Sequence, residues 1–336
     1  MTDTYTTGKY NGVGIAIETT PGTYKAPTSY IPNTKVSLDP GITDESIDVN
    51  IGKATSKFLV ARNKAEPSGE IDSPAWPENG LEALLKAMIG DATSAVQGAT
   101  TAYKHTYTES TSIPSISVTK WNEKQGTVEA MPGCYLNGLE FSYDGPGVVN
   151  MVAKFDGMDF DTSQTKPTIT LSTAKPFNWG NFKCLIDGTQ NSTVTKASIS
   201  MSRTMNKDYG AHGDGKLAPN ILVAGPLGIS GSLEFPRGSN AELNNYLDGT
   251  SAGAATTIGS TILDRTLALN LTGANIAETY DYDLLFSLPR VNMTKVDPFG
   301  DDENTQKYAW AWDALYDTVT SKTLSASSTS KLTAIT

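Results

Sequence analysis

Residues that commonly carry chemistry are scarce in this chain of 336 residues, which contains only two histidines. His105 stands in a strand-like run of alternating polarity, where we expect a solvent-facing imidazole. His212 stands in a glycine-rich turn, and Asp208 and Asp214 are the acidic residues nearest to it. A metal site needs more ligands than these. We therefore predict neither a histidine-based triad nor a bound metal.

Other signatures of catalysis are missing as well. The sequence contains no Gly-x-Ser-x-Gly motif, no phosphate-binding glycine-lysine loop and no Gly-x-Gly-x-x-Gly motif. The acidic run 301–304 has oxygen ligands for calcium, but a solvated hairpin tip is the simpler interpretation. Paired carboxylates for glycoside cleavage need no fixed spacing, so that possibility stays open. We predict no catalytic residue and no cofactor.

The composition argues against several other classes of protein. The formal charge is −10, whereas tight binding of DNA needs clustered Lys and Arg that displace counterions. No secretory signal and no apolar stretch of about 20 residues for a membrane helix is visible. Cys134 and Cys184 fall in strand-like runs, and we expect two buried, reduced thiols. The pattern favours a protein made in a reducing cytoplasm, with no membrane partner.

The elements that would position any site are mostly strands. One helix is predicted over 78–89, because five apolar residues recur there with helical spacing. These residues are Leu81, Leu84, Leu85, Met88 and Ile89. Alternating apolar residues on both sides of Asp144–Gly147 predict a β-hairpin over 139–155. A second, shorter helix is predicted over 239–248, with Ser239 or Asn240 as its cap.

Part of the sequence occurs twice with a fixed period. Ser68–Pro74 resembles Ser230–Pro236 at an offset of 162 (230 − 68), and a predicted helix follows each run. Upstream, Val36 and Leu38 correspond to Ile199 and Met201 at an offset of 163 (199 − 36). Two copies are too few for a solenoid. They indicate two similar domains in one chain.

We divide the chain accordingly, as a mainly β protein with two tandem domains. The predicted parts are an N-terminal arm (1–30), a first domain (31–160), a linker (161–178), a second domain (179–318) and a Ser/Thr-rich tail (319–336) that is mobile at its tip. Each domain contains a long polar stretch, 41–67 and 202–229. Loops of this length are usually functional, although plain surface loops are the alternative.

Several of these segments resemble the major tail tube proteins of long-tailed bacteriophages. The resemblance lies in the run Ile15–Pro27, in Ser68–Asp72, in the leucine-rich helix that ends at Ile89-Gly90 and in the hairpin Tyr135–Phe155. It covers residues 10–160 directly and residues 180–316 through the repeat.

The resemblance implies a fold and an assembly. The fold would be a β-sandwich or small barrel with one flanking helix per domain, and neighbouring subunits would join their sheets edge to edge around a channel. Single-domain members form six-membered rings, so a duplicated chain favours a homotrimeric, pseudo-hexameric ring over a plain hexamer. Rings would stack into a tube in the virion tail, assembled in the host cytoplasm. Double-stranded DNA would pass through an acidic bore without tight binding, and partners would include the tail terminator and the tape measure protein.

The first long stretch carries charges of both signs. We predict contacts between rings for seven of its residues, which are Asp44, Glu45, Asp48, Lys53, Lys57, Arg62 and Lys64. A hairpin whose charges pair with one another in solvent is the alternative.

Two other classes of function remain as alternatives at this stage. One is a β-rich carbohydrate-binding module or glycoside-processing enzyme that acts as a monomer, although the aromatic residues that would line a sugar cleft are thinly spread. The other is a surface adhesin, which the missing signal segment disfavours.

Overall fold

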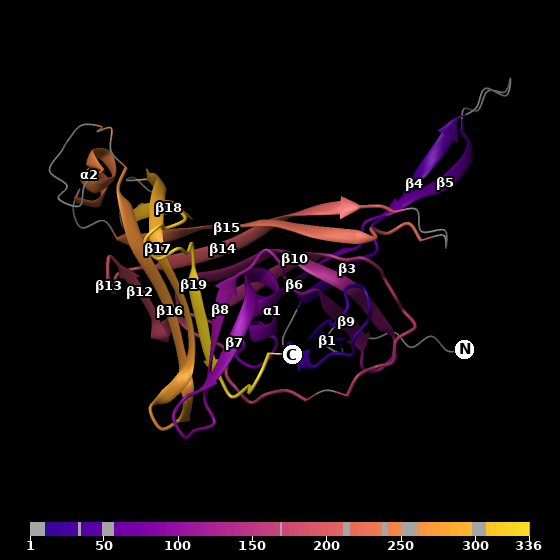
Figure 1. The fold of residues 1–336 in the computed structure, drawn as a ribbon, viewed down its shortest axis with the longest axis horizontal. Coiled ribbons are helices and arrows are strands. Elements are labelled where there is room, and N and C mark those ends of the chain that lie inside the picture. The colour runs from indigo at the N-terminus through magenta and orange to yellow at the C-terminus, as the bar shows by residue number, and fades with distance from the viewer. Residues whose placement is uncertain are drawn as a thin grey trace.

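The protein is mainly β, with two short α-helices (Figure 1). The structure is a computed structural model that describes residues 11–32, 35–48, 57–168, 170–210, 216–236, 241–249, 258, 260, 262–297 and 307–335. The predicted site residue Lys53, the acidic run 301–304, His212, and the proposed caps Ser239 and Asn240 lie outside the described residues.

The elements of the first half are β1 (Asn11–Ile17), β2 (Ser29–Tyr30), β3 (Lys35–Asp39), β4 (Ile42–Asp48), β5 (Lys57–Ala65), β6 (Ser68–Pro74), α1 (Leu81–Ile89), β7 (Gly90–Val96), β8 (Tyr103–Glu109), β9 (Ile116–Asn122), β10 (Val128–Asp144) and β11 (Asn150–Asp156). Those of the second half are η2 (Trp179–Asn181), β12 (Phe182–Ile186), β13 (Thr189–Asn191), β14 (Lys196–Asp208), β15 (Ile221–Pro236), α2 (Ala241–Asp248), β16 (Asp264–Ala277), β17 (Tyr280–Asp297), β18 (Lys307–Ala314) and β19 (Ser325–Ser330).

Most strands belong to one large antiparallel sheet. In the first half the order of paired strands is β2-β1-β9-β10-β11-β6-β3. In the second half it is β13-β12-β16-β17-β18-β15-β14. A ladder between β10 and β14 joins the two orders. The strands β4 and β5 pair only with each other among the described strands, and Figure 1 shows this hairpin standing away from the body.

The two strand orders correspond in register as well as in sequence of pairing. Ser68 lies opposite Asp156, and its counterpart in the repeat, Ser230, lies opposite Asp313. The ladders of β10 shift register between Met131 and Cys134 and between Leu136 and Gly138. Those of β17 shift between Leu288 and Val291 and between Met293 and Lys295, at a constant offset of 157 (288 − 131 and 295 − 138). Irregularities at matching positions are a stronger sign of correspondence than regular strands, since bulges are specific features of a fold.

One predicted correspondence was wrong by two positions. Val36 lies opposite Ile71, whereas Leu233, the counterpart of Ile71 in the repeat, lies opposite Ala197. The counterpart of Val36 is therefore Ala197 and not Ile199. Alternation of apolar residues fixes the face of a strand but not a shift by two, because such a shift keeps every side chain on the same face.

The helix α1 is the centre of the core. It contacts β1, β7, β8 and β10, and Lys86 is its only residue that is not buried. It was predicted from residue 78 but begins at Leu81, because Glu78 and Gly80 have positive φ angles of 64° and 91°. It ends before Gly90, where a Cβ atom would lie 2.5 Å from the Cβ of Ser110. The second helix, predicted over 239–248, is present as α2.

A buried arginine from the second half closes the C-terminal end of α1. Arg203, in β14, donates from Nε to the carbonyl oxygen of Met88 at 2.9 Å and from Nη2 to those of Ile89 and Ser110 at 3.2 and 3.0 Å. Its Nη1 donates to the carbonyl oxygen of Gly225 at 2.9 Å. These carbonyls include two that the helix leaves unsatisfied, and a cation at this end also complements the helix dipole.

The C-terminal tail, predicted to be mobile at its tip, forms a strand and packs against the body in its described residues. Its strand β19 lies between β17 and β8, and therefore connects a strand of the second half with one of the first. Ala326 and Ser328 are 1% exposed, and Ile335 is also buried. Runs of small side chains often indicate disorder, but here they are what fits between two closely packed strands.

The N-terminal arm predicted for residues 1–30 is also partly wrong. Residues 11–17 form β1, which pairs with β9 along its whole length, and Ile15 is fully buried. Two glycines of this strand allow close packing. A Cβ on Gly12 would overlap the Trp121 ring, and one on Gly14 would lie 2.6 Å from Pro27 Cβ.

The remaining expectations concern the two long polar stretches, the predicted linker and membrane helices. Both long polar stretches are formed largely by antiparallel strands, β4 with β5 and the ends of β14 and β15. In the described residues of 161–178 there is no helix and no strand longer than an isolated bridge. Within the described part of the chain no helix is long and apolar enough to cross a membrane.

The contacts of Arg203 lead to a stability prediction. Replacing Arg203 with Met removes all four hydrogen bonds from the guanidinium to carbonyl oxygens, so we expect the free energy of unfolding to fall by about 3 kcal/mol. Urea unfolding of dilute protein, followed by circular dichroism, measures the change. Lys35→Met is the matched control, since the Lys35 side chain is 89% exposed. Equal stability of the two variants would contradict the assigned role of Arg203.

Candidate assembly surfaces

The described residues contain no cluster of His, Cys, Asp and Glu that could hold a metal ion. His105 was expected to face solvent, but it is fully buried. Its Nδ1 is 2.8 Å from Ser94 Oγ and its Nε2 is 3.0 Å from Ser330 Oγ. Burial lowers the pKa of His105, so the ring is a neutral structural group. Sequence reasoning missed this burial because it predicts a mobile tail where the covering strand, β19, lies.

The two cysteines are buried free thiols, as predicted. Burial, and secondarily the charge of Glu18, raises the pKa of Cys134 well above its usual value. Burial raises the pKa of Cys184 to about 12. Both thiols therefore stay protonated at neutral pH and are not nucleophiles.

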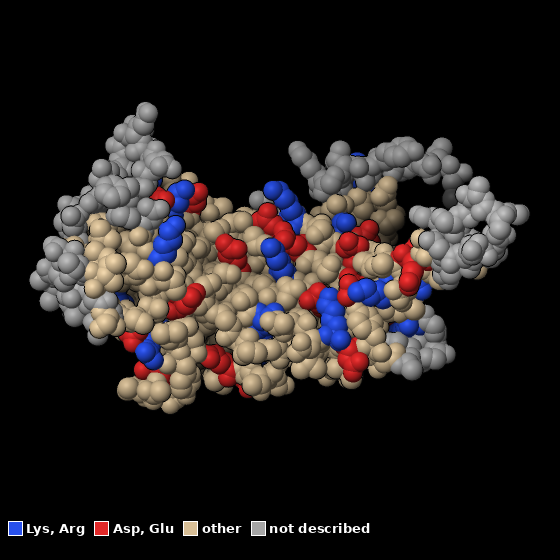
Figure 2. All heavy atoms as spheres, turned by 90° about the horizontal axis from the view of Figure 1, so that it is seen from above, with Lys and Arg blue, Asp and Glu red and all other residues tan. Residues whose placement is uncertain are grey.

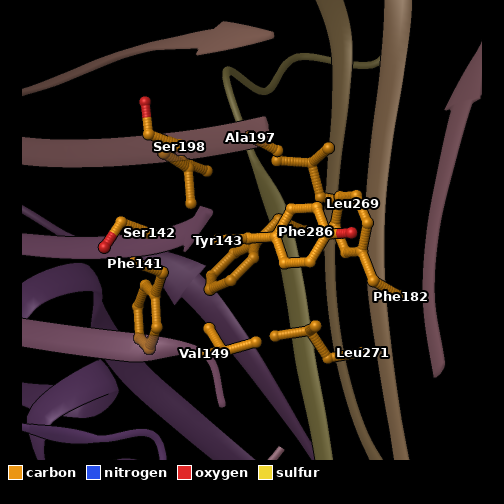
Figure 3. A pocket seen from close by; sticks show the side chains of 11 residues that line it. Phe141, Ser142, Tyr143, Val149, Phe182, Ala197, Ser198, Leu269, Leu271 and Phe286 are labelled. Carbon is orange, nitrogen blue, oxygen red and sulfur yellow. The ribbon is translucent and has the colours of Figure 1, made fainter. Parts of the chain in front are cut away.

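The apolar pocket in Figure 3 lies at the junction of the two halves and is too small for a ligand. Its volume is about 20 Å³, and it is lined from the first half by Phe141, Tyr143 and Val149 on or next to the β10–β11 hairpin. Across from them stand Phe182, Ile199 and other apolar side chains of β12, β14, β16 and β17. The rings of Phe141 and Phe286 are 5.3 Å apart, and those of Tyr143 and Phe182 are 4.8 Å apart. This is a packing gap in a shared core.

The ladder above that core joins the halves and is called the internal seam. It runs from Gly138 opposite Ser202 to Asp144 opposite Lys196. At its end Lys196 Nζ lies 3.1 Å from Asp144 Oδ1. A strand added to a sheet in this way satisfies the backbone groups of both edges.

The solvent side of the joined sheet is called the outer sheet face. It comprises the side chains of β3, β6, β11, β10, β14, β15, β18 and the end of β17 that point away from the buried Ile71, Leu139 and Ile199. Its described charged residues are Lys35, Lys154, Lys196, Lys295 and Lys307 with Asp39, Glu70, Asp72, Glu140, Asp144, Asp156, Glu234 and Asp313, five positive against eight negative. Because Asp156 is also ion-paired with Lys207 of β14, at 2.9 Å, the excess is two negative charges per chain.

Charges of the two signs alternate on the molecule. Four lysines of the outer sheet face form ion pairs across strands, namely Lys35–Asp72, Lys154–Glu70, Lys196–Asp144 and Lys307–Glu234. Figure 2, a view from above Figure 1, shows Lys and Arg interspersed with Asp and Glu and no large patch of one sign. The chain therefore offers no positively charged groove for nucleic acid on the face in view.

The hairpin β4–β5 holds the charged residues that were predicted to contact another ring. Arg62 Nε lies 3.8 Å from Asp44 Oδ1, and Lys64 Nζ lies 3.1 Å from Glu66 Oε1. Glu45 is exposed, and Asp48 lies opposite Lys57 in the ladder. The structure thus brings these six together on one hairpin and pairs Asp44 with Arg62 inside it.

The base of this hairpin is braced by the second long stretch. Ala65 donates its N–H to the carbonyl oxygen of Leu217 at 3.0 Å, and Tyr209 donates its hydroxyl to Glu66 Oε1 at 2.8 Å. The hydrogen bonds of Tyr209 and Lys64 lower the pKa of Glu66. A braced base aims the hairpin in one direction, which an assembly contact requires.

A buried carboxylate organises the N-terminal run that carried the resemblance. Glu18 accepts hydrogen bonds from Ser115 Oγ and Ser117 Oγ at 2.7 and 2.6 Å. It also accepts from the backbone N–H groups of Gly22 and Gly133 at 2.9 and 2.8 Å. This satisfied carboxylate ties the turn after β1 to β9 and β10. Sequence reasoning missed it because most of its partners are distant along the chain.

Two neighbouring carboxylates, Glu78 and Glu82, lie at the start of α1, and Glu78 connects it with three distant segments. Glu78 Oε1 accepts from the hydroxyl of Tyr282 at 2.9 Å and from the N–H of Lys331 at 2.6 Å, and Oε2 accepts from Ser172 Oγ at 2.6 Å. Glu82, 1% exposed, accepts from the N–H of Glu78 at 3.1 Å. Burial raises the pKa of Glu82 to about 7.

Comparison with known proteins identifies one family. The sequence profile of the family described as phage tail tube protein matches residues 8–314 of the chain. No curated protein matches it. The matched range contains both strand orders and the hairpin β4–β5, and it ends with β18.

The buried Glu82 leads to a prediction about pH. Between about pH 4.5 and 7 the folded chain holds a proton at Glu82 that the unfolded chain has released, so stability falls as the pH rises through this window. The loss is about 3 kcal/mol, and it is complete above about pH 7. Glu82→Gln should therefore be more stable than the natural chain at pH 8, with little difference at pH 4.5.

Urea unfolding at several pH values measures this difference. Glu140→Gln is the control, because Glu140 is exposed in a neighbouring strand. A difference between the natural chain and Glu82→Gln that does not change with pH would contradict the assignment.

Proposed function

Because the chain belongs to the phage tail tube protein family, we propose that three copies close into a ring and that rings stack around a bore for double-stranded DNA. Family membership makes the chain a structural protein of the virion tail, and not an enzyme. The monomeric glycoside-processing alternative is therefore set aside. The terminator and the tape measure protein are the proposed partners at the ends and in the bore of the tube.

The correspondence between the two strand orders carries the proposal of a pseudo-hexameric ring. Each order has seven strands paired in the same sequence, and the register shifts of β10 are matched by those of β17. We interpret each order as one tube module, so that one chain supplies two adjacent positions of a six-fold arrangement. Three chains then complete the ring, whereas six chains would supply twice the modules required.

We assign the bore to the outer sheet face. This face is continuous across both modules through the internal seam, which suits the inner wall of a closed ring. Its excess of two negative charges per chain repels phosphate groups within a Debye length of about 8 Å at physiological salt. The many cross-strand ion pairs keep this repulsion moderate, so that DNA would be neither held nor excluded.

We assign contacts between rings to the hairpin β4–β5. It projects from the body, its base is braced by Tyr209 and Leu217, and it carries charges of both signs. Exposed ion pairs contribute little to the stability of a single chain. When two surfaces associate, these charged groups lose water, and only a surface with complementary charges compensates for that loss. The charges therefore determine which surfaces meet.

The ring is tested by the mass and shape of the assembled protein. We expect concentrated purified chain to give rings or tubes in negative-stain electron microscopy, and a ring mass three times the chain mass of 35.7 kDa. Native mass spectrometry distinguishes this from a six-chain ring of twice that ring mass. Compact single particles at every concentration would contradict the proposal.

The hairpin is tested by deletion of residues 44–64. We expect a folded chain that still forms rings but not stacked tubes, because Ile42 and Ala65 are paired at the base and the remaining sheet is untouched. Tube lengths in negative stain measure the effect. Tubes of natural length would exclude the hairpin as the contact between rings.

A charge exchange distinguishes contacts between rings from ion pairs within the hairpin. Asp44→Arg combined with Arg62→Asp keeps the ion pair within the hairpin but reverses its orientation. We expect shorter tubes if the charges meet another ring, whereas a hairpin that pairs only with itself leaves assembly unchanged.

A further inference from the structure

The internal seam is built where one strand replaces another along β10. The ladder between β9 and β10 ends with Ile116 opposite Cys134. From Gly138 onward β14 occupies that side of β10, while β11 continues on the other side. The seam therefore requires a strand, β10, that extends beyond its first neighbour.

The strand β17 has the same arrangement in the second half. The ladder between β16 and β17 ends with Asp264 opposite Asn292, and β17 continues to Asp297 with β18 on its other side. Since the register shifts of β10 and β17 match at a constant offset, Gly138 corresponds to Lys295. The described end of β17, residues 295–297, thus corresponds to the part of β10 that receives β14.

The strand β3 corresponds in turn to β14. Lys35–Asp39 pairs with β6 as Lys196–Ser200 pairs with β15, and in the described part of the chain β3 forms a ladder with β6 alone. Val36 and Leu38 are half-buried, whereas their counterparts Ala197 and Ile199 are 5% and 2% exposed. A strand laid against β3 would complete that burial.

We propose that β3 of one chain pairs antiparallel with the end of β17 of a second copy, in the register that repeats the internal seam. Gly138 opposite Ser202 translates to Lys295 opposite Gly41, and Glu140 opposite Ser200 translates to Asp297 opposite Asp39. This inference rests on the proposed ring and names the two edges that close it. Repeated around three chains, internal seams and β3–β17 contacts alternate in one continuous sheet.

Local backbone features set the end of this contact. Gly41 has a φ of +60°, and a Cβ there would overlap the carbonyl oxygen of Glu66, so the chain turns from β3 into β4 at this residue. Pro40 has no N–H to donate. The contact between chains is therefore shorter than the internal seam, which extends to Lys196 and Asp144. The turn also places the hairpin β4–β5 directly beside the neighbouring chain.

Site-directed cross-linking tests the register. Asp39→Cys and Asp297→Cys are made in separate full-length chains, mixed, allowed to assemble and oxidised with copper phenanthroline. Residues directly opposite in an antiparallel ladder have Cα atoms close enough for a disulfide. We expect a covalent dimer in a non-reducing gel, and at least about tenfold less from Ser37→Cys mixed with Asp297→Cys, because that pair is two residues out of register. The natural thiols do not compete, since Cys134 and Cys184 are 0% and 1% exposed.

Two further chains complete the experiment. Glu140→Cys with Ser200→Cys in one chain should form a disulfide within that chain, because these residues lie opposite in the internal seam. Asp39→Cys with Asp297→Cys in one chain should give a series of bands in a non-reducing gel that ends at the covalent trimer, as a closed ring requires.

The outcomes separate the register from the ring. Rings in negative stain without the Asp39–Asp297 cross-link, or with stronger Ser37–Asp297 cross-linking, overturn the register and leave the proposed function standing. A folded chain that forms the internal disulfide but neither rings nor cross-links overturns both.

Discussion

The requirement that the edge of a β-sheet be paired governs this molecule. Each half builds a seven-strand order that begins and ends in an edge, and an exposed edge carries a row of unsatisfied N–H and C=O groups. The chain satisfies these groups along one such edge internally, because β14 pairs with β10. Behind this seam the apolar side chains of both halves meet in one core, with Phe141 against Phe286. Neither half buries this surface without the other.

Three long-range contacts hold the halves in that relation. Arg203 of β14 closes the C-terminal end of α1 through buried carbonyl groups. Glu78 at the other end of α1 accepts hydrogen bonds from Tyr282 and Lys331 of the second half. The strand β19 adds a backbone ladder between β8 and β17. A helix fixed at both ends by the opposite half gives the seam a defined angle, which a ring of fixed curvature needs.

The sequence was informative where the signal is local or periodic. The apolar stripe of α1, the turn at Asp144–Gly147 and the internal repeat all had direct physical causes, and the helix, the hairpin and the matched β6 and β15 are present. It failed where the cause is a distant partner. The segment with Gly12 was assigned to an arm because Trp121 was not known to lie against it, and His105 was expected to be exposed because β19 was not known to cover it. Of the candidate site, the hairpin could be located from its length and charge, but its internal pair Asp44–Arg62 could not.

Joining two modules in one chain changes the energetics of the proposed ring. Every association of separate bodies costs on the order of 4–15 kcal/mol in lost translational and rotational freedom. A seam within the chain forms during folding and avoids that cost, so a ring of three chains needs two such associations, whereas a ring of six chains needs five. The contact between chains can then be weak, as the presence of Pro40 beside β3 suggests for this molecule. Weak lateral contacts gain most from stacking, and hence favour growth of a tube at its end, where each new chain makes both kinds of contact.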